Sequence, residues 1–79
     1  MKLKTIADFY GADRVRIYKG CLAEENKIAD FPLGYMSLKN EIFSRIDMAE
    51  YGNREVSFMS IKLGTLNNDR EVVLEIMLA

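Results

Sequence analysis

The sequence predicts a small α+β domain in which an antiparallel sheet of three to four strands has one or two helices packed on one face. Three observations lead to this fold class. Residues 70–78 alternate between aliphatic and mixed side chains, which is typical of a half-buried antiparallel strand. Residues 55–63 are rich in β-forming residues, and residues 37–52 can place apolar side chains on one helical face. The 79 residues have the length of a single domain, 1–79.

The chain starts with a short amphipathic segment, residues 3–10, which is predicted to be helical. Leu3, Ile6 (or Ala7) and Tyr10 fall on one face of that helix. A first strand is predicted at residues 13–20, because apolar and polar side chains alternate there. Its inward side chains are Val15 and Ile17, and its outward side chains are Arg14, Arg16 and Tyr18.

The middle of the chain is less regular. Residues 24–27 are predicted to form a polar turn, and Ile28, Phe31 and Leu33 a buried, extended return. Residues 37–52 have two interpretations. As a helix, Ser37 caps the stretch and an apolar stripe follows; as a strand, alternate residues from 42 to 48 point the same way. The length favours the helix, because strands in so small a domain are shorter. The stripe is formed by Leu38, Ile42, Ile46 and Ala49.

The last two strands are predicted to form a hairpin. In the first, a bulge near Phe58 and Met59 would bring most apolar groups to one side. Residues 64–69 contain Asn and Asp and are predicted to form the turn. The second runs almost to Ala79 and is expected at an edge of the sheet. Its aliphatic face is Val72, Leu74, Ile76 and Leu78, and its mixed face is Glu71, Val73, Glu75 and Met77.

The composition argues against an enzyme. The chain has no His, which removes the commonest general base. Its one Cys, Cys21, has Lys19 nearby but no orienting partner. A zinc site would need carboxylates almost alone, and the glycines are scattered singly, so no phosphate-binding loop exists. No catalytic residue, metal site or cofactor is predicted.

The charge and hydropathy patterns restrict the partners. The net charge of −1 gives no field that would steer the chain toward DNA or an anionic membrane. No apolar run approaches the roughly 20 residues of a membrane span, and no secretory signal is expected, because residues 1–8 contain no apolar core. With a single Cys, the cytoplasm is the expected location.

Four short stretches carry a resemblance to a known class of proteins. They are residues 7–11 (ADFYG), 13–18 (DRVRIY), 51–56 (YGNREV) and 73–76 (VLEI). Together they resemble uncharacterised short accessory proteins of phages and conjugative elements of Gram-positive bacteria. The similarity covers about a third of the chain and implies a mobile-element setting, in which small inhibitors of host defence are common. It assigns no binding or catalytic residue.

Protein binding is the function that this composition favours. The mixed face of the last strand is neither fully polar nor fully apolar, and Met and Tyr are adaptable contact groups. The expected partner is a host or mobile-element protein, for example a host defence protein inhibited by steric occlusion, and a homodimer is expected as well. The predicted protein-binding residues are Tyr35, Met36, Phe58, Met59, Val73 and Met77.

Two other functions are kept as alternatives. Basic and aromatic side chains on the outer face of the first strand could bind nucleic acid through charge and stacking, although nearby Asp8 and Asp13 dilute the patch. The residues concerned are Arg14, Arg16, Tyr18 and Lys19. The other alternative is an oligomeric small-ligand binder with its pocket at a subunit interface.

Overall fold

The computed structural model describes residues 1–66 and 69–79, with the side chains of these ranges except at 65, 66 and 69. Its described part holds four strands and two α-helices, so the predicted α+β class is confirmed. The strands are β1 Arg14–Lys19, β2 Lys27–Pro32, β3 Val56–Leu66 and β4 Asp69–Leu78. The helices are α1 Leu38–Arg45 and α2 Met48–Tyr51, with 3₁₀ turns at Leu3–Thr5 and Glu24–Asn26.

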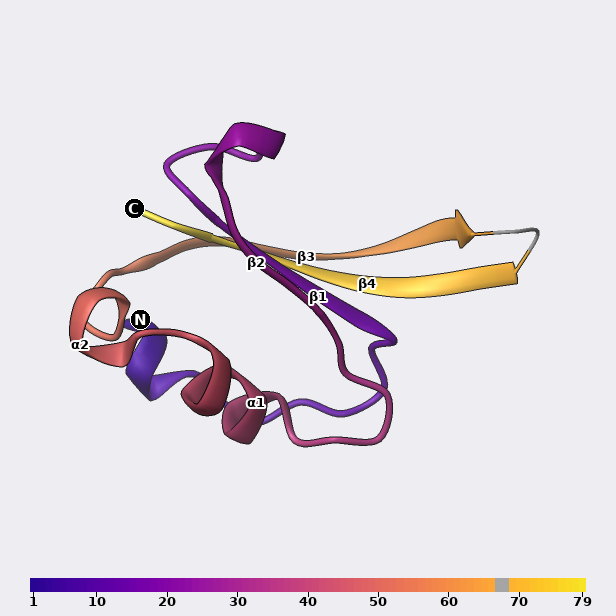
Figure 1. Ribbon diagram of the computed structural model, residues 1–79, viewed down its shortest axis with the longest axis horizontal. Coiled ribbons are helices and arrows are strands. Elements are labelled where there is room, and N and C mark those ends of the chain that lie inside the picture. The colour runs from indigo at the N-terminus through magenta and orange to yellow at the C-terminus, as the bar shows by residue number, and fades with distance from the viewer. Residues whose placement is uncertain (67–68) are drawn as a thin grey trace.

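The four strands form one mixed sheet in the order β2-β1-β4-β3 (Figure 1). The outer pairs, β1 with β2 and β3 with β4, are antiparallel, but β1 and β4 run parallel. The expectation of a purely antiparallel sheet was therefore wrong. The reason is that the chain between β2 and β3 forms the helices, and the hairpin then brings β4 beside β1.

The position of β4 also corrects the expected sheet edge. β4 lies between β1 and β3 and is paired on both sides, so it is a central strand. The outer strands are β2 and β3. The nearness of this strand to Ala79 did not predict its place in the sheet. Its pairing partner β1 lies more than fifty residues away in the sequence, and no local sequence pattern indicates that pairing.

The β3–β4 hairpin is confirmed, with a longer ladder than expected (Figure 1). The register shifts between Val56 and Phe58, which places the bulge at Ser57, next to its predicted position. Of the predicted turn 64–69, residues 64–66 belong to β3 and residue 69 to β4, and residues 67–68 lie outside the described residues.

Residues 37–52 hold two helices, α1 and α2, as the spacing favoured, and the strand interpretation was wrong. The Ser37 hydroxyl accepts the Asn40 N–H and caps α1. The first helix, α1, ends before Ile46. The second helix, α2, begins after Asp47, whose carboxylate caps it. Leu38, Ile42 and Ile46 are buried, whereas Ala49 is exposed, because the break rotates α2 away from the stripe.

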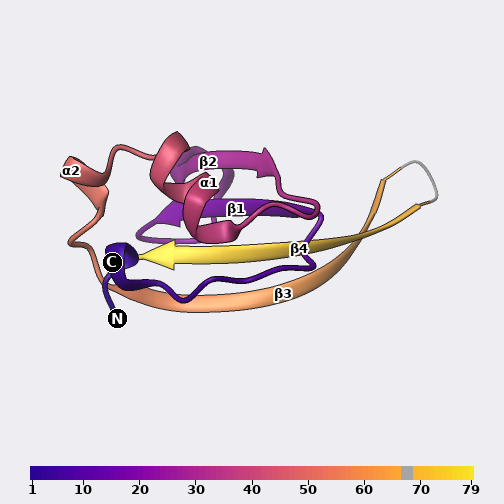
Figure 2. The same ribbon diagram turned by 90° about the horizontal axis from the view of Figure 1, so that it is seen from below.

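The N-terminal segment is helical only at the 3₁₀ turn Leu3–Thr5, so the predicted helix over 3–10 was largely wrong. Residues 6–12, here called the N-terminal stretch, then run alongside the β3–β4 hairpin (Figure 2). Ile6 is buried, whereas Tyr10 is 62% exposed. The Asp8 carboxylate accepts the Ser37 hydroxyl at 2.7 Å and 2.8 Å, which ties this stretch to the start of α1.

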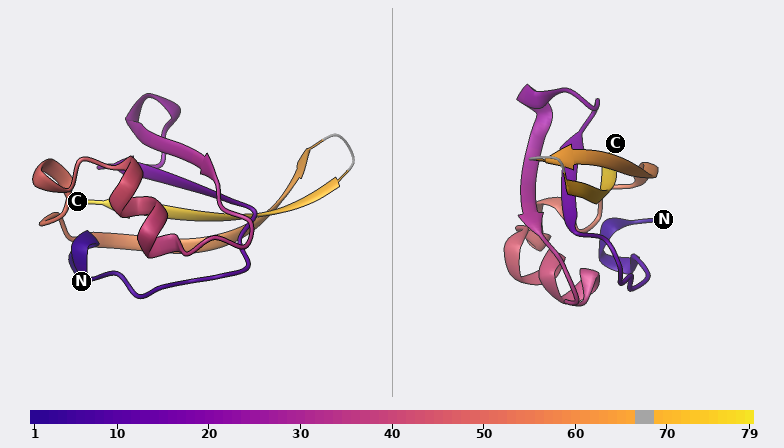
Figure 3. Two further views of the ribbon diagram at one scale, coloured as in Figure 1. Left: turned by 60° about the horizontal axis from the view of Figure 1, so that its bottom comes forward. Right: turned by 90° about the vertical axis from the view of Figure 1, so that its right-hand side faces the viewer.

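The core lies between the sheet and a layer made by the two helices and the N-terminal stretch, which occupy the same side of the sheet (Figure 3). Alternate residues of the two central strands supply its sheet side. They are Val15 and Ile17 of β1, with Leu74, Ile76 and Leu78 of β4. The helical region contributes Leu38, Ile42 and Ile46 to the core. Residues 1–12 contribute Leu3, Ile6 and Ala12. Among the described residues, neither α-helix lies on the opposite side of the sheet, which we call the helix-free side.

Candidate protein-binding surface

β3 has a long outer edge whose backbone is available for pairing. One edge of the strand pairs with β4 over its full length. At the start of the outer edge, the Val56 N–H donates to the Met1 carbonyl at 2.7 Å, and Lys2 bridges to Glu55. From Ser57 to Gly64, no backbone hydrogen bond to a partner outside the hairpin exists within the described ranges. Alternate N–H and C=O groups of this segment therefore point away from the sheet.

The same strand carries a row of exposed apolar side chains on the helix side of the sheet. Met59, Ile61 and Leu63 are 39%, 56% and 71% exposed. They pair with Ile76, Leu74 and Val72 of β4, so the row continues the core layer beyond the helices. We call these three residues the β3 apolar row. Apolar side chains exposed in a line along a free edge are typical of a binding surface.

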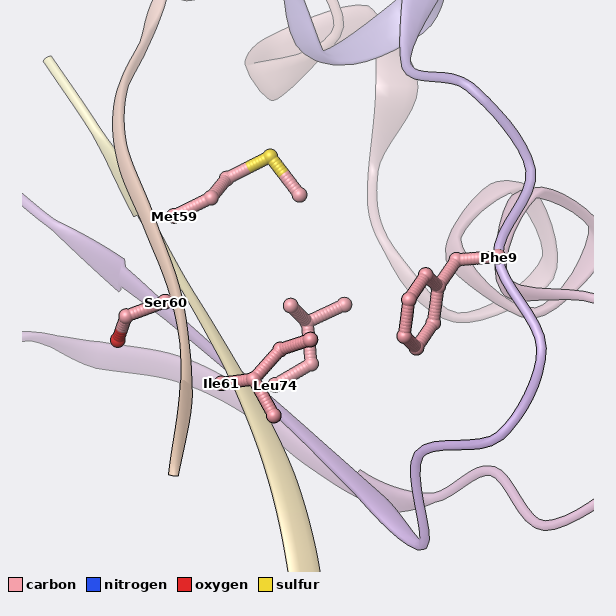
Figure 4. Close-up of a pocket in the computed structure, with 5 residues that line it drawn as sticks. All are labelled: Phe9, Met59, Ser60, Ile61 and Leu74. Carbon is pink, nitrogen blue, oxygen red and sulfur yellow. The ribbon is translucent and has the colours of Figure 1, made fainter. Parts of the chain in front are cut away.

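A pocket of about 330 Å³ lies between this row and the N-terminal stretch (Figure 4). The side chains of Phe9, Met59, Ile61 and Leu74 converge on it, whereas the Ser60 hydroxyl points away (Figure 4). Phe9 is held in place because its own N–H donates to the Asp8 carboxylate at 2.9 Å. The pocket is thus lined by hydrocarbon and thioether groups and suits an apolar side chain.

The Asp8 carboxylate is the anchor of the pocket wall formed by the N-terminal stretch. Its partners are the Ser37 hydroxyl, the backbone N–H groups of Phe9 and Lys39, and the Tyr10 hydroxyl. The hydrogen bond from Ser37, helped by the other donors, lowers the pKa of Asp8 below its ordinary value. The carboxylate is therefore ionised at neutral pH and holds the N-terminal stretch in place through charge-assisted hydrogen bonds.

The helix-free side of the sheet is covered by long polar side chains instead of a second layer. Glu75 of β4 is only 4% exposed. Its carboxylate accepts the Tyr18 hydroxyl at 3.2 Å and lies 2.7 Å from the Lys62 ammonium. Burial, together with the negative charge of Glu75, raises the pKa of Tyr18. Tyr18 is 5% exposed, so one residue of the outward face predicted for β1 is buried, whereas Arg14 and Arg16 are only partly buried.

The arginines of β1 are paired with acids. Arg14 forms ion pairs with Asp30 and Glu71, and Arg16 lies 3.4 Å from Asp30. Burial alone would raise the pKa of Asp30, but the hydrogen bonds from Arg14 and Lys27 outweigh it and lower that pKa. These acidic partners neutralise the positive charge of Arg14 and Arg16, on which the nucleic-acid alternative relied. Lys19, at the end of β1, is exposed.

The structure does not gather the predicted protein-binding residues into one patch. Tyr35 and Met36 are exposed in the loop between β2 and α1. Met59 lies in the β3 apolar row, but Phe58 points to the helix-free side. Val73 is only 3% exposed and Met77 is partly buried. Because β4 is central, its mixed face is covered by neighbouring side chains and offers little contact area.

Sequence reasoning missed the part that Phe9, Ile61 and Leu63 play in the surface. Ile61 and Leu63 alternate with polar residues, which is the same pattern that a buried strand face gives. The signal that could have found them is length, because β3 has 11 residues whereas β1 and β2 have 6 each. A strand that outruns the layer beneath it must expose part of its apolar face.

Other kinds of site are not found in the described part of the chain. No group of three or more metal-ligating residues occurs among the described residues, and the Cys21 thiol is free and exposed. No helix there is both long and apolar enough to cross a bilayer. Comparisons with protein-family models, curated proteins and solved structures found no match.

Proposed function

We propose that this protein is a non-catalytic protein-binding module that accepts an extended segment of a partner along the outer edge of β3. The observation that carries the proposal is the coincidence of a free backbone edge, Ser57–Gly64, with the β3 apolar row on the same strand. In strand addition, main-chain hydrogen bonds give affinity, and pockets for alternate side chains give specificity. β3 offers both.

The pocket defines the chemistry of the partner. A strand added to β3 places every second side chain on the helix side of the sheet. One of these side chains would lie beside Ile61 and over the pocket, with Phe9 closing the other side. The favoured partner segment is therefore extended, with apolar residues at alternate positions.

The resemblance to accessory proteins of phages and conjugative elements supports a mobile-element setting for this activity. In that setting the partner is a host or mobile-element protein in the cytoplasm. Strand addition then acts by covering a functional surface of that partner. Inhibition of a host defence protein by steric occlusion is the concrete form of the proposal.

A peptide-display selection tests the proposed binding mode. Random extended peptides are selected against the wild-type protein and counter-selected against Ile61→Lys, which places a charge in the β3 apolar row. Phe43→Lys is the matched control, because Phe43 lies on α1 and is 47% exposed. Enriched peptides with alternating apolar residues that bind wild type and Phe43→Lys, but not Ile61→Lys, support the proposal. Failure to enrich any peptide, or enrichment indifferent to Ile61→Lys, contradicts it.

A second experiment addresses the mobile-element setting. The wild-type protein and Ile61→Lys are each used to capture partners from lysates of Gram-positive hosts. A host defence protein captured by the wild type and lost in Ile61→Lys supports steric occlusion. Absence of a stable partner in every host tested counts against it.

A further inference from the structure

The outer edge of β3 is complementary to itself. In an antiparallel pairing of two copies, a two-fold axis perpendicular to the sheet and passing through Ile61 sets Ile61 opposite Ile61 of the second copy. Met59 then lies opposite Leu63, and Leu63 opposite Met59. All three cross-strand pairs on the helix side are apolar, and each side chain is at least 39% exposed in the single chain. Cross-strand pairs of this kind stabilise a sheet.

The opposite side of the same pairing is also complementary. With the axis at Ile61, Phe58 lies opposite Gly64 of the second copy, and Ser60 opposite Lys62. Gly64 has no side chain, and its surroundings beyond the hairpin partner are open. An aromatic ring across from a strand glycine covers the backbone that the glycine leaves exposed. In this register, Phe58 of one copy would cover the backbone at Gly64 of the other.

Charge excludes one competing register and permits the pairing. Lys62 is the only charged residue of Val56–Leu66. An axis through Lys62 would set two ammonium groups opposite one another, which is destabilising. With the axis at Ile61, each ammonium faces a serine and keeps its own ion pair with Glu75 at 2.7 Å. The net charge of −1 per chain adds little repulsion between copies.

We propose that a second copy of this chain occupies the outer edge of β3, forming a homodimer with a continuous eight-stranded sheet. The strand order would be β2-β1-β4-β3 followed by its mirror order in the second copy. The helices of both copies lie on the same side, so the two pockets merge into one apolar layer. This inference rests on the proposed function, because the second copy would use the same outer edge of β3 as the partner segment. Self-association and partner binding therefore exclude each other.

Sedimentation equilibrium over a range of concentrations tests the homodimer. The wild type is expected to have the mass of two chains at high concentration and of one chain on dilution. Ile61→Lys sets two like charges opposite one another across the axis and is expected to raise the dissociation constant at least about tenfold. Phe43→Lys is expected to behave as the wild type. A wild type that is monomeric at every concentration, or a dimer insensitive to Ile61→Lys, overturns the inference.

Cysteine crosslinking tests the register. In a Cys21→Ser background, which removes the exposed native thiol, Ile61→Cys places two thiols directly opposite each other, within disulfide range. Leu63→Cys faces Met59 of the second copy and is the matched control. Rapid crosslinking at 61 and slow crosslinking at 63 support the proposal, and equal rates overturn it. If the wild type is monomeric while selected peptides still bind and are lost in Ile61→Lys, the homodimer fails and the proposed function stands.

Discussion

The Lys62 ammonium lies 2.7 Å from the carboxylate of Glu75, across the β3–β4 ladder. Lysines on outer strands often discourage pairing with other chains, because their charge would be stripped of water. Here the ammonium is turned to the helix-free side and its charge is matched by a buried acid. The outer edge of β3 therefore lacks an unmatched charge that would oppose an added strand.

The first prediction concerns the buried carboxylate. Glu75→Ala removes the acceptor of the Tyr18 hydroxyl in a site that is 4% exposed at Glu75. The free energy of unfolding should fall by about 1–3 kcal/mol, the cost of leaving a buried polar group unpaired. Urea denaturation measures it. Glu25→Ala is the control, because Glu25 is exposed and makes no ion pair in the part of the chain that is described; equal losses in both variants would contradict the account.

The second prediction concerns alkaline pH. Because burial and the charge of Glu75 raise the pKa of Tyr18, its stabilising contribution is present below the unfolded tyrosine pKa of about 10. It is lost as the pH rises through the folded pKa. Phenolate absorbance should show one tyrosine titrating late, and Tyr18→Phe should remove that step. A late step that persists in Tyr18→Phe would assign the shift to another residue.

The third prediction concerns the cap of α1. Ser37→Ala removes both the acceptor for the Asn40 N–H and the donor to Asp8. The free energy of unfolding should fall by about 1 kcal/mol or more. Ser44→Ala is the control, since the Ser44 hydroxyl only donates to the Glu41 carbonyl within the same helix. Thermal or urea denaturation compares the two, and a loss in Ser44→Ala as large as in Ser37→Ala would argue against the cap.

The fourth prediction concerns acid. The hydrogen bond from Ser37 lowers the pKa of Asp8, so its contribution to stability is present above the unfolded pKa of about 3.9. It is lost as the pH falls through the folded pKa. Urea midpoints measured from about pH 5 to about pH 2 should fall less steeply for Asp8→Asn than for the wild type. Glu25→Gln should leave the slope unchanged; an unchanged slope in Asp8→Asn would contradict the assignment.

The fifth prediction contrasts two isoleucines that the register of β3 and β4 places on the same side of the sheet. Ile76→Ala empties a fully buried position and should cost about 2–5 kcal/mol. Ile61→Ala acts on a side chain that is 56% exposed and should cost less than about 1 kcal/mol. Urea denaturation at concentrations where the protein is monomeric measures both. Equal costs would mean that Ile61 is part of the monomer's core.

Local patterns predicted the last two strands and the start of α1, but not the N-terminal segment, which is helical only at Leu3–Thr5. The alternation of Val72 to Leu78 and the β-rich run that follows Arg54 identified the hairpin, and Ser37 marked the start of a helix. These signals are local, because capping and side-chain periodicity depend on neighbours in the sequence. The arrangement of the strands was not predictable in this way. The parallel pairing of Val15 with Leu74 joins residues far apart in the chain, and it alone makes β4 central.

The candidate surface was only partly predictable for the same reason. Met59 was identified, but Val73 was expected to be exposed because it lies on the mixed face of its strand. The structure buries it at 3% exposure. Conversely, Ile61 alternates like a core residue and is exposed because β3 lies outermost. Which face of a strand is exposed to solvent depends on the elements that pack beside it. The sequence of the strand alone does not predict those neighbours.

Residue-by-residue amide hydrogen exchange of the Ile61→Lys variant, in dilute solution, tests most directly that β3 has the free edge. Residues Val73–Leu78 of β4 pair on both sides and should all exchange slowly. Between Ser57 and Gly64 of β3, slow and fast amides should alternate, because every second N–H points away from the sheet. Uniformly slow exchange along β3, or alternating fast exchange along β4, would contradict the account.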